Sequence, residues 1–373
     1  MVRRRSNSQA MYRDTTVHRF TLTVLWAAIA PYLVEQLRLL QSSYPVDVHL
    51  ITRRPPVDLN TPYDEDVLRG VTTTLLSEDD LFNSHVVEES VGDPAGALLV
   101  CGWNNPAFRR IALDWPRSAG PVIMSLDTNF VGSTRQRLSR FRFPRFFRRV
   151  DYAYVPGLSG SRMAHCLGFR SHQVRSGVYS VNTTVYGKPS TARSEGASAS
   201  TRTFLYVGRL IDRKGIDLLM TAYARYRLQV DQPWNLLLVG QGELAEKASA
   251  EEGVTVRGFV QPHDLPEIYR TADAFVLPSR FEPWGVVLAE AAASHLPLIV
   301  SAAVGSRHDL VVDGANGIVV PSDDVGALTA ALRELSLLDG VQLASMGQLS
   351  ALLAMKSDSQ SSAATLFSMV AGQ

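Results

Sequence analysis

This chain of 373 residues has few cysteines, almost no net charge and no long hydrophobic run. The two cysteines, Cys101 and Cys166, exclude a disulfide framework, and neither has the C-x-x-C spacing of a zinc site. Basic and acidic residues number 37 and 36, and the resulting net charge of +1 argues against a general nucleic-acid-binding protein. We therefore expect a protein of the reducing cytoplasm without a nucleic-acid partner.

An apolar stretch near the amino terminus, residues 20–34, follows Arg3, Arg4 and Arg5 and imitates a secretory signal peptide. It is shorter than the roughly 20 apolar residues that a membrane-spanning helix needs. Its pattern also changes along its length, from a β-rich run at 22–25 to helical periodicity at 32–41. We expect a strand, a loop and a helix here, and the signal peptide remains the alternative.

Short β-rich runs alternate with helical stretches along the whole chain, which predicts parallel sheets covered by helices on both faces. Residues 186–202 are poor in large apolar residues and rich in Ser, Ala and Gly, a composition typical of linkers, and we place the linker at 191–202. We therefore predict an α/β protein with two doubly wound, Rossmann-like domains, at 1–190 and 203–354, which face each other across a cleft. The expected strands are 22–25, 46–51, 97–101, 122–126, 152–155, 204–207, 235–239, 254–257, 274–277 and 298–300.

The turn after the expected strand 204–207 carries two cations, in the pairs Gly208-Arg209 and Lys214-Gly215. Two cations before a helix amino terminus suit a diphosphate, although a plain strand–helix turn with solvated cations is the alternative. A second turn, Gly240-x-Gly242, follows the next strand. It lacks the third glycine of the dinucleotide fingerprint, which disfavours NAD.

Two carboxylates flank the start of a predicted helix, Glu282 in the preceding loop and Glu290 within it. The helix opens at Gly285, Val286 and Val287, whose free N–H groups point into the cleft. Glu282 is suited to hold sugar hydroxyls, and Glu290 is suited to hold a ribose diol. The helix end is suited to hold a phosphate. Both glutamates could instead be solvated, but the alanines around Glu290 predict a partner for its charge.

Three motifs stand here in a fixed order and spacing: the two glycine–cation pairs, the glycine turn and Glu282-x7-Glu290. Together they resemble the retaining nucleotide-sugar glycosyltransferases of family 4, also named glycosyl transferases group 1. The resemblance extends from Thr203 to about Asp324. It implies the GT-B fold, in which the tail 355–373 returns to the first domain.

The resemblance also implies roles for the motif residues. Arg209 and Lys214 would neutralise the diphosphate leaving group and Glu282 would contact the transferred sugar. The implied donor-binding set is Gly208, Gly240, Gly242, Trp284, Gly285, Val286, Val287 and Glu290. No metal or cofactor is implied, because the nucleotide-diphosphate sugar is the substrate, and Asp64-Glu-Asp66 is interpreted as a solvated loop.

The first half departs from the family pattern. Its first loop, residues 27–32, lacks the usual glycines, and Asp127 and Asn129 stand where many members have a histidine. Asp127 either faces the transferred sugar as a catalytic group or caps the next helix. Asn129 and Trp103 are candidate acceptor contacts, and Trp103 has packing as its alternative. We expect a hexosyltransferase that acts with retention on a glycan or lipid-linked acceptor in polysaccharide synthesis; a nucleotide-sugar-binding module and an epimerase are the competing functions.

Residues 135–149 contain seven arginines, four phenylalanines and no acidic residue. This composition indicates a peripheral contact with an anionic membrane surface, at the inner face of the membrane. A solvated helix with its phenylalanines in the core is the alternative, and nucleic acid is a less favoured one. The resemblance favours the membrane, since lipid-linked acceptors accompany such surfaces in the family.

Overall fold

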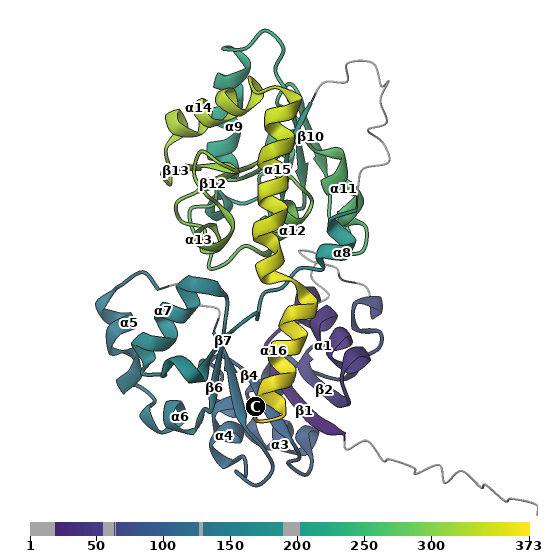
Figure 1. Ribbon diagram of the computed structural model, residues 1–373, viewed down its shortest axis with the longest axis vertical. Coiled ribbons are helices and arrows are strands. Elements are labelled where there is room, and N and C mark those ends of the chain that lie inside the picture. The colour runs from purple at the N-terminus through teal and green to yellow at the C-terminus, as the bar shows by residue number, and fades with distance from the viewer. Residues whose placement is uncertain (1–18, 55–62, 64, 127–129, 189–201) are drawn as a thin grey trace, which may run out of the picture.

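The computed structural model describes residues 19–54, 63, 65–126, 130–188 and 202–373. These residues form two sheets, with strand orders β3-β2-β1-β4-β5-β6-β7 and β10-β9-β8-β11-β12-β13. Every pairing of neighbouring strands is parallel. Figure 1 shows the two sheets in two lobes, one above the other, each with helices on both sides. The predicted pair of doubly wound domains is confirmed.

The first lobe is built around the seven-stranded sheet. Its strands are β1 (Phe20–Trp26), β2 (Val46–Arg53), β3 (Thr72–Leu76), β4 (Ala97–Cys101), β5 (Val122–Ser125), β6 (Tyr152–Val155) and β7 (Val174–Ser176). Its helices are α1 (Pro31–Ser43), α2 (Glu78–Phe82), α3 (Ser84–Val91), α4 (Pro106–Asp114), α5 (Thr134–Leu138), α6 (Pro144–Arg149) and α7 (Gly157–Leu167). Three 3-10 turns, η1 (Glu65–Leu68), η2 (Ser139–Phe141) and η3 (Ser171–Gln173), connect them.

The second lobe is built around the six-stranded sheet. Its strands are β8 (Thr203–Val207), β9 (Asn235–Val239), β10 (Val254–Arg257), β11 (Ala274–Leu277), β12 (Leu298–Ser301) and β13 (Gly317–Val320). Its helical elements are η5 (Asp212–Lys214), α9 (Ile216–Arg227), α10 (Ala245–Ser249), α11 (Leu265–Thr271), α12 (Val286–Ala293), α13 (Arg307–Leu310), α14 (Val325–Ser336) and α15 (Gly340–Ala354). All ten strands that the sequence predicts are present in the two lobes, whereas β3, β7 and β13 were not predicted.

Two segments join the lobes. The short helix α8 (Thr183–Tyr186) follows the first sheet in the chain but packs against α11 and α12 of the second lobe. At the other end of the chain, α15 continues through η6 (Met355–Ser357) into α16 (Ser359–Val370), which packs against α1 and β1 of the first lobe (Figure 1). The predicted linker 191–202 lies outside the described residues except for Arg202.

The strands β4, β5, β11 and β12 are buried along their whole length except at Cys101, which explains their near-continuous apolar sequences. Each sheet has its own core, and the carboxyl ends of the strands in both lobes carry the loops where doubly wound folds bind ligands. In the part of the chain that the structure describes, no helix is both long and apolar enough to cross a membrane.

Candidate active site

The loops at the carboxyl ends of β8 and β11 are tied together by an ion pair between Lys214 and Glu282. The Lys214 Nζ atom donates to Glu282 Oε2, and the two side chains are only 17% and 11% exposed. Beside them, the Arg280 N–H donates to the Arg213 carbonyl at 3.0 Å. Two residues that stand 68 positions apart in the sequence thus meet in one nearly buried charged pair.

Arg209 lies at the same strand ends, next to this pair. The buried hydroxyl of Tyr206 donates to the Arg209 carbonyl at 2.9 Å. Burial raises the pKa of Tyr206, the charge of Glu282 raises it further, and the charge of Arg209 opposes that rise. Both charges therefore act on one hydroxyl, and Glu282 in turn pairs with Lys214, so Arg209 belongs to the same charged neighbourhood as that ion pair.

Glycine is required where these strand ends meet. A Cβ atom on Gly240, whose φ is +140°, would lie 1.9 Å from the Gly208 carbonyl oxygen. A Cβ atom on Gly242 would lie 2.3 Å from the carbonyl oxygen of Leu210. The structure therefore gives Gly240 and Gly242 a packing role, and their contribution to donor binding remains a prediction.

Helix α12 opens beside Glu282 without a side-chain cap. Its N-cap residue, Gly285, has a φ of +89°, a conformation that favours glycine, and makes no side-chain cap hydrogen bond. The preceding residue, Trp284, is fixed by Ser306, which donates to its carbonyl oxygen through both its N–H (3.0 Å) and its hydroxyl (2.6 Å). The first amide groups of α12, at Val286 and Val287, thus start where the sequence predicts an anion site.

Glu290 has the partners that its alanine-rich surroundings predict. The hydroxyl of Tyr269, on α11, donates to Glu290 Oε2 at 2.9 Å. Tyr186, on α8, forms a second hydrogen bond with the Glu290 side chain. Burial raises the pKa of Glu290, and both tyrosine hydroxyls oppose that rise because they donate to the ionised form.

The first lobe meets this site through aromatic rings and one helix end. The ring of Tyr179 is stacked on Trp284, with centroids 6.2 Å apart, and also contacts Tyr32 at the start of α1. Nearby, Asp309 of the second lobe accepts the Leu158 N–H at the start of α7, at 3.1 Å and 3.2 Å to its two oxygens. The two lobes are therefore in direct contact at two separate points.

The candidate residues of the first lobe are placed less fully. Asp127 and Asn129 lie outside the described residues. Trp103 is half-buried, its ring contacts Phe147 at a centroid distance of 5.6 Å, and it packs against the core of the first lobe. Packing is thus the role that the structure shows for Trp103, and an acceptor contact remains a prediction.

The arginine-rich segment divides into a buried and an exposed part. Phe146 and Phe147 are in the core, and Arg149, only 8% exposed, donates to the Trp115 carbonyl (2.9 Å) and pairs with Asp151 (2.9 Å). Phe141, in contrast, is 62% exposed, beneath the guanidinium of Arg140. The remaining arginines that face solvent are Arg135, Arg137, Arg142, Arg145 and Arg148.

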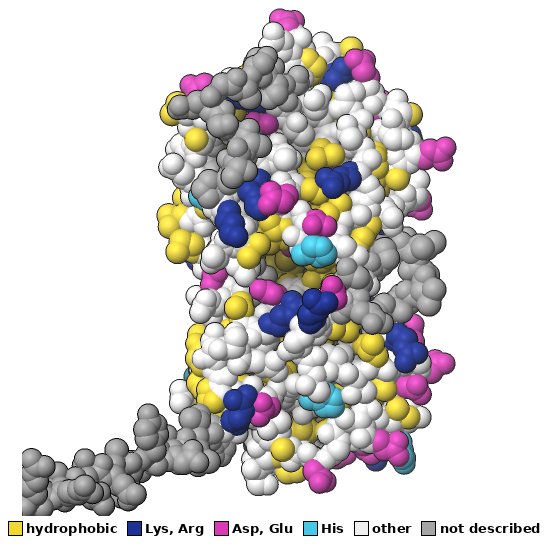
Figure 2. All heavy atoms as spheres, turned by 90° about the vertical axis from the view of Figure 1, so that its right-hand side faces the viewer, with side chains coloured by type: hydrophobic (Ala, Val, Ile, Leu, Met, Phe, Trp, Pro, Cys, Tyr) yellow, Lys and Arg dark blue, Asp and Glu magenta, His cyan; other side chains and the backbone are white. Residues whose placement is uncertain are grey.

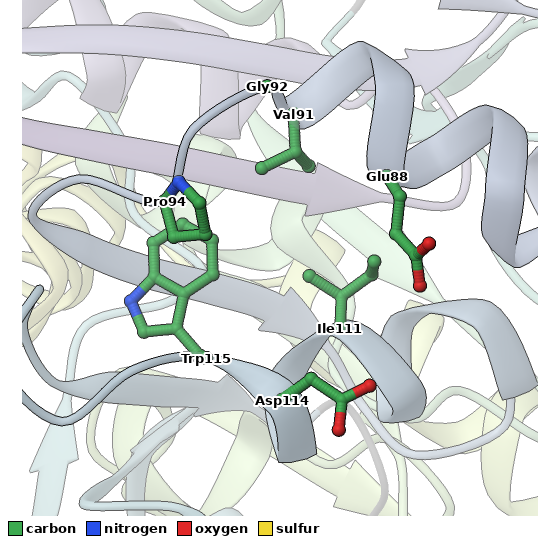
Figure 3. A pocket seen from close by; sticks show the side chains of 7 residues that line it. All are labelled: Glu88, Val91, Gly92, Pro94, Ile111, Asp114 and Trp115. Carbon is green, nitrogen blue, oxygen red and sulfur yellow. The ribbon is translucent and has the colours of Figure 1, made fainter.

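A surface hollow of about 240 Å³ lies elsewhere, between α3 and α4 of the first lobe (Figure 3). Its floor is apolar, with Trp115 and Ile111, and its rim carries Glu88 and Asp114. Arg110 bridges these two carboxylates at 3.4 Å and 3.7 Å. None of the predicted site residues lines this hollow.

The described residues contain no group of three or more His, Cys, Asp or Glu side chains that could hold a metal ion. In the acidic triplet 64–66, Asp66 pairs with Arg69 at 2.6 Å, and Asp64 lies outside the described residues. Sequence reasoning missed Tyr186, Tyr206, Tyr269 and Asp309. Their roles depend on contacts between distant segments, and nothing in their local sequence signals them.

Comparison with known proteins shows a family match in the part of the chain that contains the second lobe. Residues 188–347 match the family model described as Glycosyl transferases group 1. Among curated relatives, mannosylfructose-phosphate synthase of Agrobacterium fabrum is 35% identical over 133 residues, 30% of this chain and 29% of that protein. Glycogen synthase of Mycobacterium tuberculosis is 34% identical over 136 residues, 35% of this chain and 32% of that protein. These matches cover about a third of the relatives' length.

Solved structures match nearly the whole chain. Sucrose-phosphate synthase from Thermosynechococcus elongatus has a TM-score of 0.70 at 21% identity and covers 95% of this chain and 99% of its own. The Anabaena protein HepE, solved with UDP and glucose, has a TM-score of 0.70 at 16% identity and covers 95% of this chain and all of its own. The likeness establishes the fold, and the predicted GT-B arrangement is confirmed.

Proposed function

From the premise that residues 188–347 form a glycosyl transferases group 1 domain, we propose that this protein transfers a sugar from a nucleotide-diphosphate donor to a hydroxyl acceptor. The observation that carries the proposal is the charged cluster of Arg209, Lys214 and Glu282 at the carboxyl ends of β8 and β11. Beside that cluster, α12 presents an uncapped amino terminus. This arrangement offers cations and amide groups to a diphosphate and a carboxylate to the sugar attached to it.

The chemistry follows from where charge develops. When the bond between the sugar C1 atom and the diphosphate oxygen breaks, negative charge grows on the leaving diphosphate. Arg209 and Lys214 stabilise that charge more in the transition state than in the ground state and thereby lower the barrier. Glu282 holds the hydroxyls of the transferred sugar. In the free protein it also neutralises Lys214, which explains how the lysine is kept nearly buried before the donor arrives.

We propose that transfer proceeds with retention, as the likeness to family 4 implies. The acceptor oxygen then bonds to C1 on the face that the diphosphate leaves. The acceptor proton passes to the departing phosphate oxygen, so no separate protein base is needed for this step. Asp127 is proposed to face the transferred sugar, and Asn129 the acceptor.

The acceptor is proposed to be a glycan or a lipid-linked sugar, in polysaccharide or glycoconjugate synthesis. The exposed arginines of the segment 135–149, with Phe141 beside them, support a peripheral contact with anionic lipid. Relatives with lipid acceptors occur among the matches, such as the phosphatidylinositol monomannoside mannosyltransferase of Mycolicibacterium smegmatis, 34% identical over 156 residues. In this proposal the enzyme works at the inner face of the membrane.

A nucleotide-sugar-binding module without turnover is the second candidate. It is favoured by the chain of rings Tyr32, Tyr179 and Trp284, which joins the lobes where family members carry a glycine loop. Incubation of the pure protein with labelled UDP-, GDP- and ADP-sugars separates the candidates. Transfer to an acceptor, or slow donor hydrolysis, supports the enzyme; tight binding with neither supports the module; and release of an altered sugar without acceptor identifies an epimerase.

A further inference from the structure

Three tyrosines from separate parts of the chain converge on Glu290. Tyr269 comes from α11 and Tyr186 from α8, and their rings meet edge to face with centroids 5.6 Å apart. Burial raises the pKa of Tyr63, from the first lobe, and the charge of Glu290 raises it further. Tyr269 is fully buried and Tyr186 is 8% exposed, whereas Glu290 itself is half-buried. The carboxylate is therefore contacted by the phenol hydroxyls of two other helices.

The hydrogen bonds leave part of the carboxylate unused. A carboxylate offers about four lone-pair sites to donors. Tyr269 occupies one site on Oε2, and Tyr186 donates to the same side chain. Counting the contacts among the described residues, two acceptor sites remain, which is the number that the two hydroxyls of a vicinal diol require.

We propose that Tyr186 and Tyr269 are positioning residues, which hold the Glu290 carboxylate in the one orientation that accepts both hydroxyls of the donor's ribose. This inference rests on the proposed function, since it takes the nucleotide-sugar donor as the ligand. Neither tyrosine touches the donor; each acts through Glu290. Because Tyr186 ends α8, the segment that joins the lobes also helps to shape the ribose site.

Few elements packed against α12 carry charged side chains. The elements α15, β11 and β12 carry no ionisable side chain, and α13 carries Arg307, His308 and Asp309. Helix α11 carries Glu267 and Arg270, which form an ion pair with each other at 2.6 Å. On the side of α8, Glu35 of the first lobe faces Tyr186 and raises the pKa of that hydroxyl, as burial and Glu290 do. Both tyrosines therefore remain protonated donors at neutral pH.

The pH dependence has a definite sign. Burial raises the pKa of Glu290, and the tyrosine hydroxyls hold that rise back. Removal of one hydroxyl therefore raises the pKa further. Because the ionised carboxylate is the form that accepts two hydroxyls, donor affinity is lost as the pH falls through this pKa. In Tyr269→Phe that loss begins at a higher pH than in the wild type.

The test compares nucleotides with and without the diol. Calorimetry on the full chain measures Kd for UDP, GDP and ADP, and for the 2′,3′-dideoxy form of the one that binds most tightly. We expect the wild type to prefer the diol by at least about tenfold, the scale of one hydrogen bond to a charged group. Tyr269→Phe and Tyr186→Phe should each reduce that preference by at least about threefold and leave the dideoxy Kd unchanged.

The control is Tyr223→Phe, another buried tyrosine of the second lobe, whose hydroxyl donates to the carbonyl oxygens of Trp234 and Gly253. It should leave the preference intact. Two results would overturn the inference but not the proposed function. The first is an equal loss of affinity for the diol and the dideoxy nucleotide in the Tyr186 and Tyr269 variants. The second is a preference for the diol, and a loss of donor affinity at low pH, that are both unchanged from the wild type. A wild type that binds none of the three nucleotides would overturn both.

Discussion

At the scale of single residues, the ion pair Lys214–Glu282 gives the most specific prediction about activity. Each side chain is nearly buried and has the other as an ion-pair partner, so removal of one breaks the charged pair at the proposed diphosphate site. We expect Lys214→Ala and Glu282→Ala each to lower the transfer rate by at least about 10²-fold, as loss of a charge-stabilising group does. Initial rates with a labelled donor measure this.

The matched control is Lys247→Ala, which removes an exposed lysine of α10 in the same lobe. It should leave the rate within about twofold of the wild type, as expected for a surface substitution. Near-normal rates in both site variants would show that the charged pair has no part in transfer.

The crowding at Gly240 leads to a prediction about stability. A Cβ atom there would lie 1.9 Å from a backbone oxygen that cannot move without disturbing the strand end. Gly240→Ala should lower the free energy of unfolding by about 3 kcal/mol, the scale of severe overpacking. Gly314→Ala is the control, since Gly314 also has a positive φ (+75°) but has open space around it, and should cost only about 1 kcal/mol. Urea denaturation followed by circular dichroism compares the two, and equal losses would refute the crowding argument.

The sequence predicts some of these residues and not others, for a physical reason. Lys214, Glu282 and Glu290 stand in motifs whose spacing along the chain signals a site. A partner for Glu290 could also be predicted, since a carboxylate among alanines needs one. The identity of the partners could not, because Tyr186 and Tyr269 reach Glu290 from two other helices.

At the scale of elements, helix α7 takes its amino-terminal cap from the opposite lobe. Its own N-cap residue, Pro156, supplies no side-chain cap, and Asp309 of α13 accepts the Leu158 N–H instead. Asp309→Ala should therefore expose the first turn of α7 and speed amide exchange there by about fivefold or more, the scale of a lost cap of about 1 kcal/mol. Hydrogen–deuterium exchange with mass spectrometry reports it.

Asp324→Ala provides the comparison, because Asp324 caps α14 within its own lobe by accepting the Ala327 N–H at 2.8 Å. It should speed exchange at the start of α14 and leave α7 unchanged. If Asp309→Ala leaves exchange at α7 as in the wild type, the lobes do not make this contact in solution.

The strands missed by sequence reasoning share a position at the edge of a sheet. β3 and β7 are the outer strands of the first sheet, and β13 is an outer strand of the second. β3 contains three threonines, and β7 has only three residues, so neither shows the apolar run that marks a central strand. The central strands were predicted nearly to the residue because they are buried on both faces.

At the scale of the whole molecule, the exposed arginines on α5, η2 and α6 concentrate positive charge on one side of the first lobe. Figure 2 shows a different side, that of α1, α8 and α11, where basic and acidic side chains are interspersed. The triple variant Arg137→Ser, Arg145→Ser and Arg148→Ser should weaken sedimentation with vesicles that contain anionic lipid by about tenfold or more, at about 1 kcal/mol per basic residue. Arg149 is left intact because it is part of the core.

A control with the same change in net charge replaces Arg69, Arg225 and Arg333, which are exposed elsewhere on the molecule. It should sediment like the wild type, and neutral vesicles should bind neither protein. Equal sedimentation of both triple variants with anionic vesicles would refute a membrane surface at 135–149.

The overall architecture follows from the sequence, because the alternation of strands and helices specifies two doubly wound sheets. The contact between the lobes does not, since it depends on single pairs such as Tyr179 with Trp284 and Leu158 with Asp309. These pairs join residues about 100 or more positions apart, and no local pattern marks them.

The most direct test of the account is a crystal structure with a bound nucleotide-diphosphate sugar. We predict that its diphosphate lies within hydrogen-bond distance of Arg209, Lys214 and the first amide groups of α12, with the sugar on Glu282. A diphosphate bound elsewhere, with the ion pair between Lys214 and Glu282 unbroken, would contradict the account.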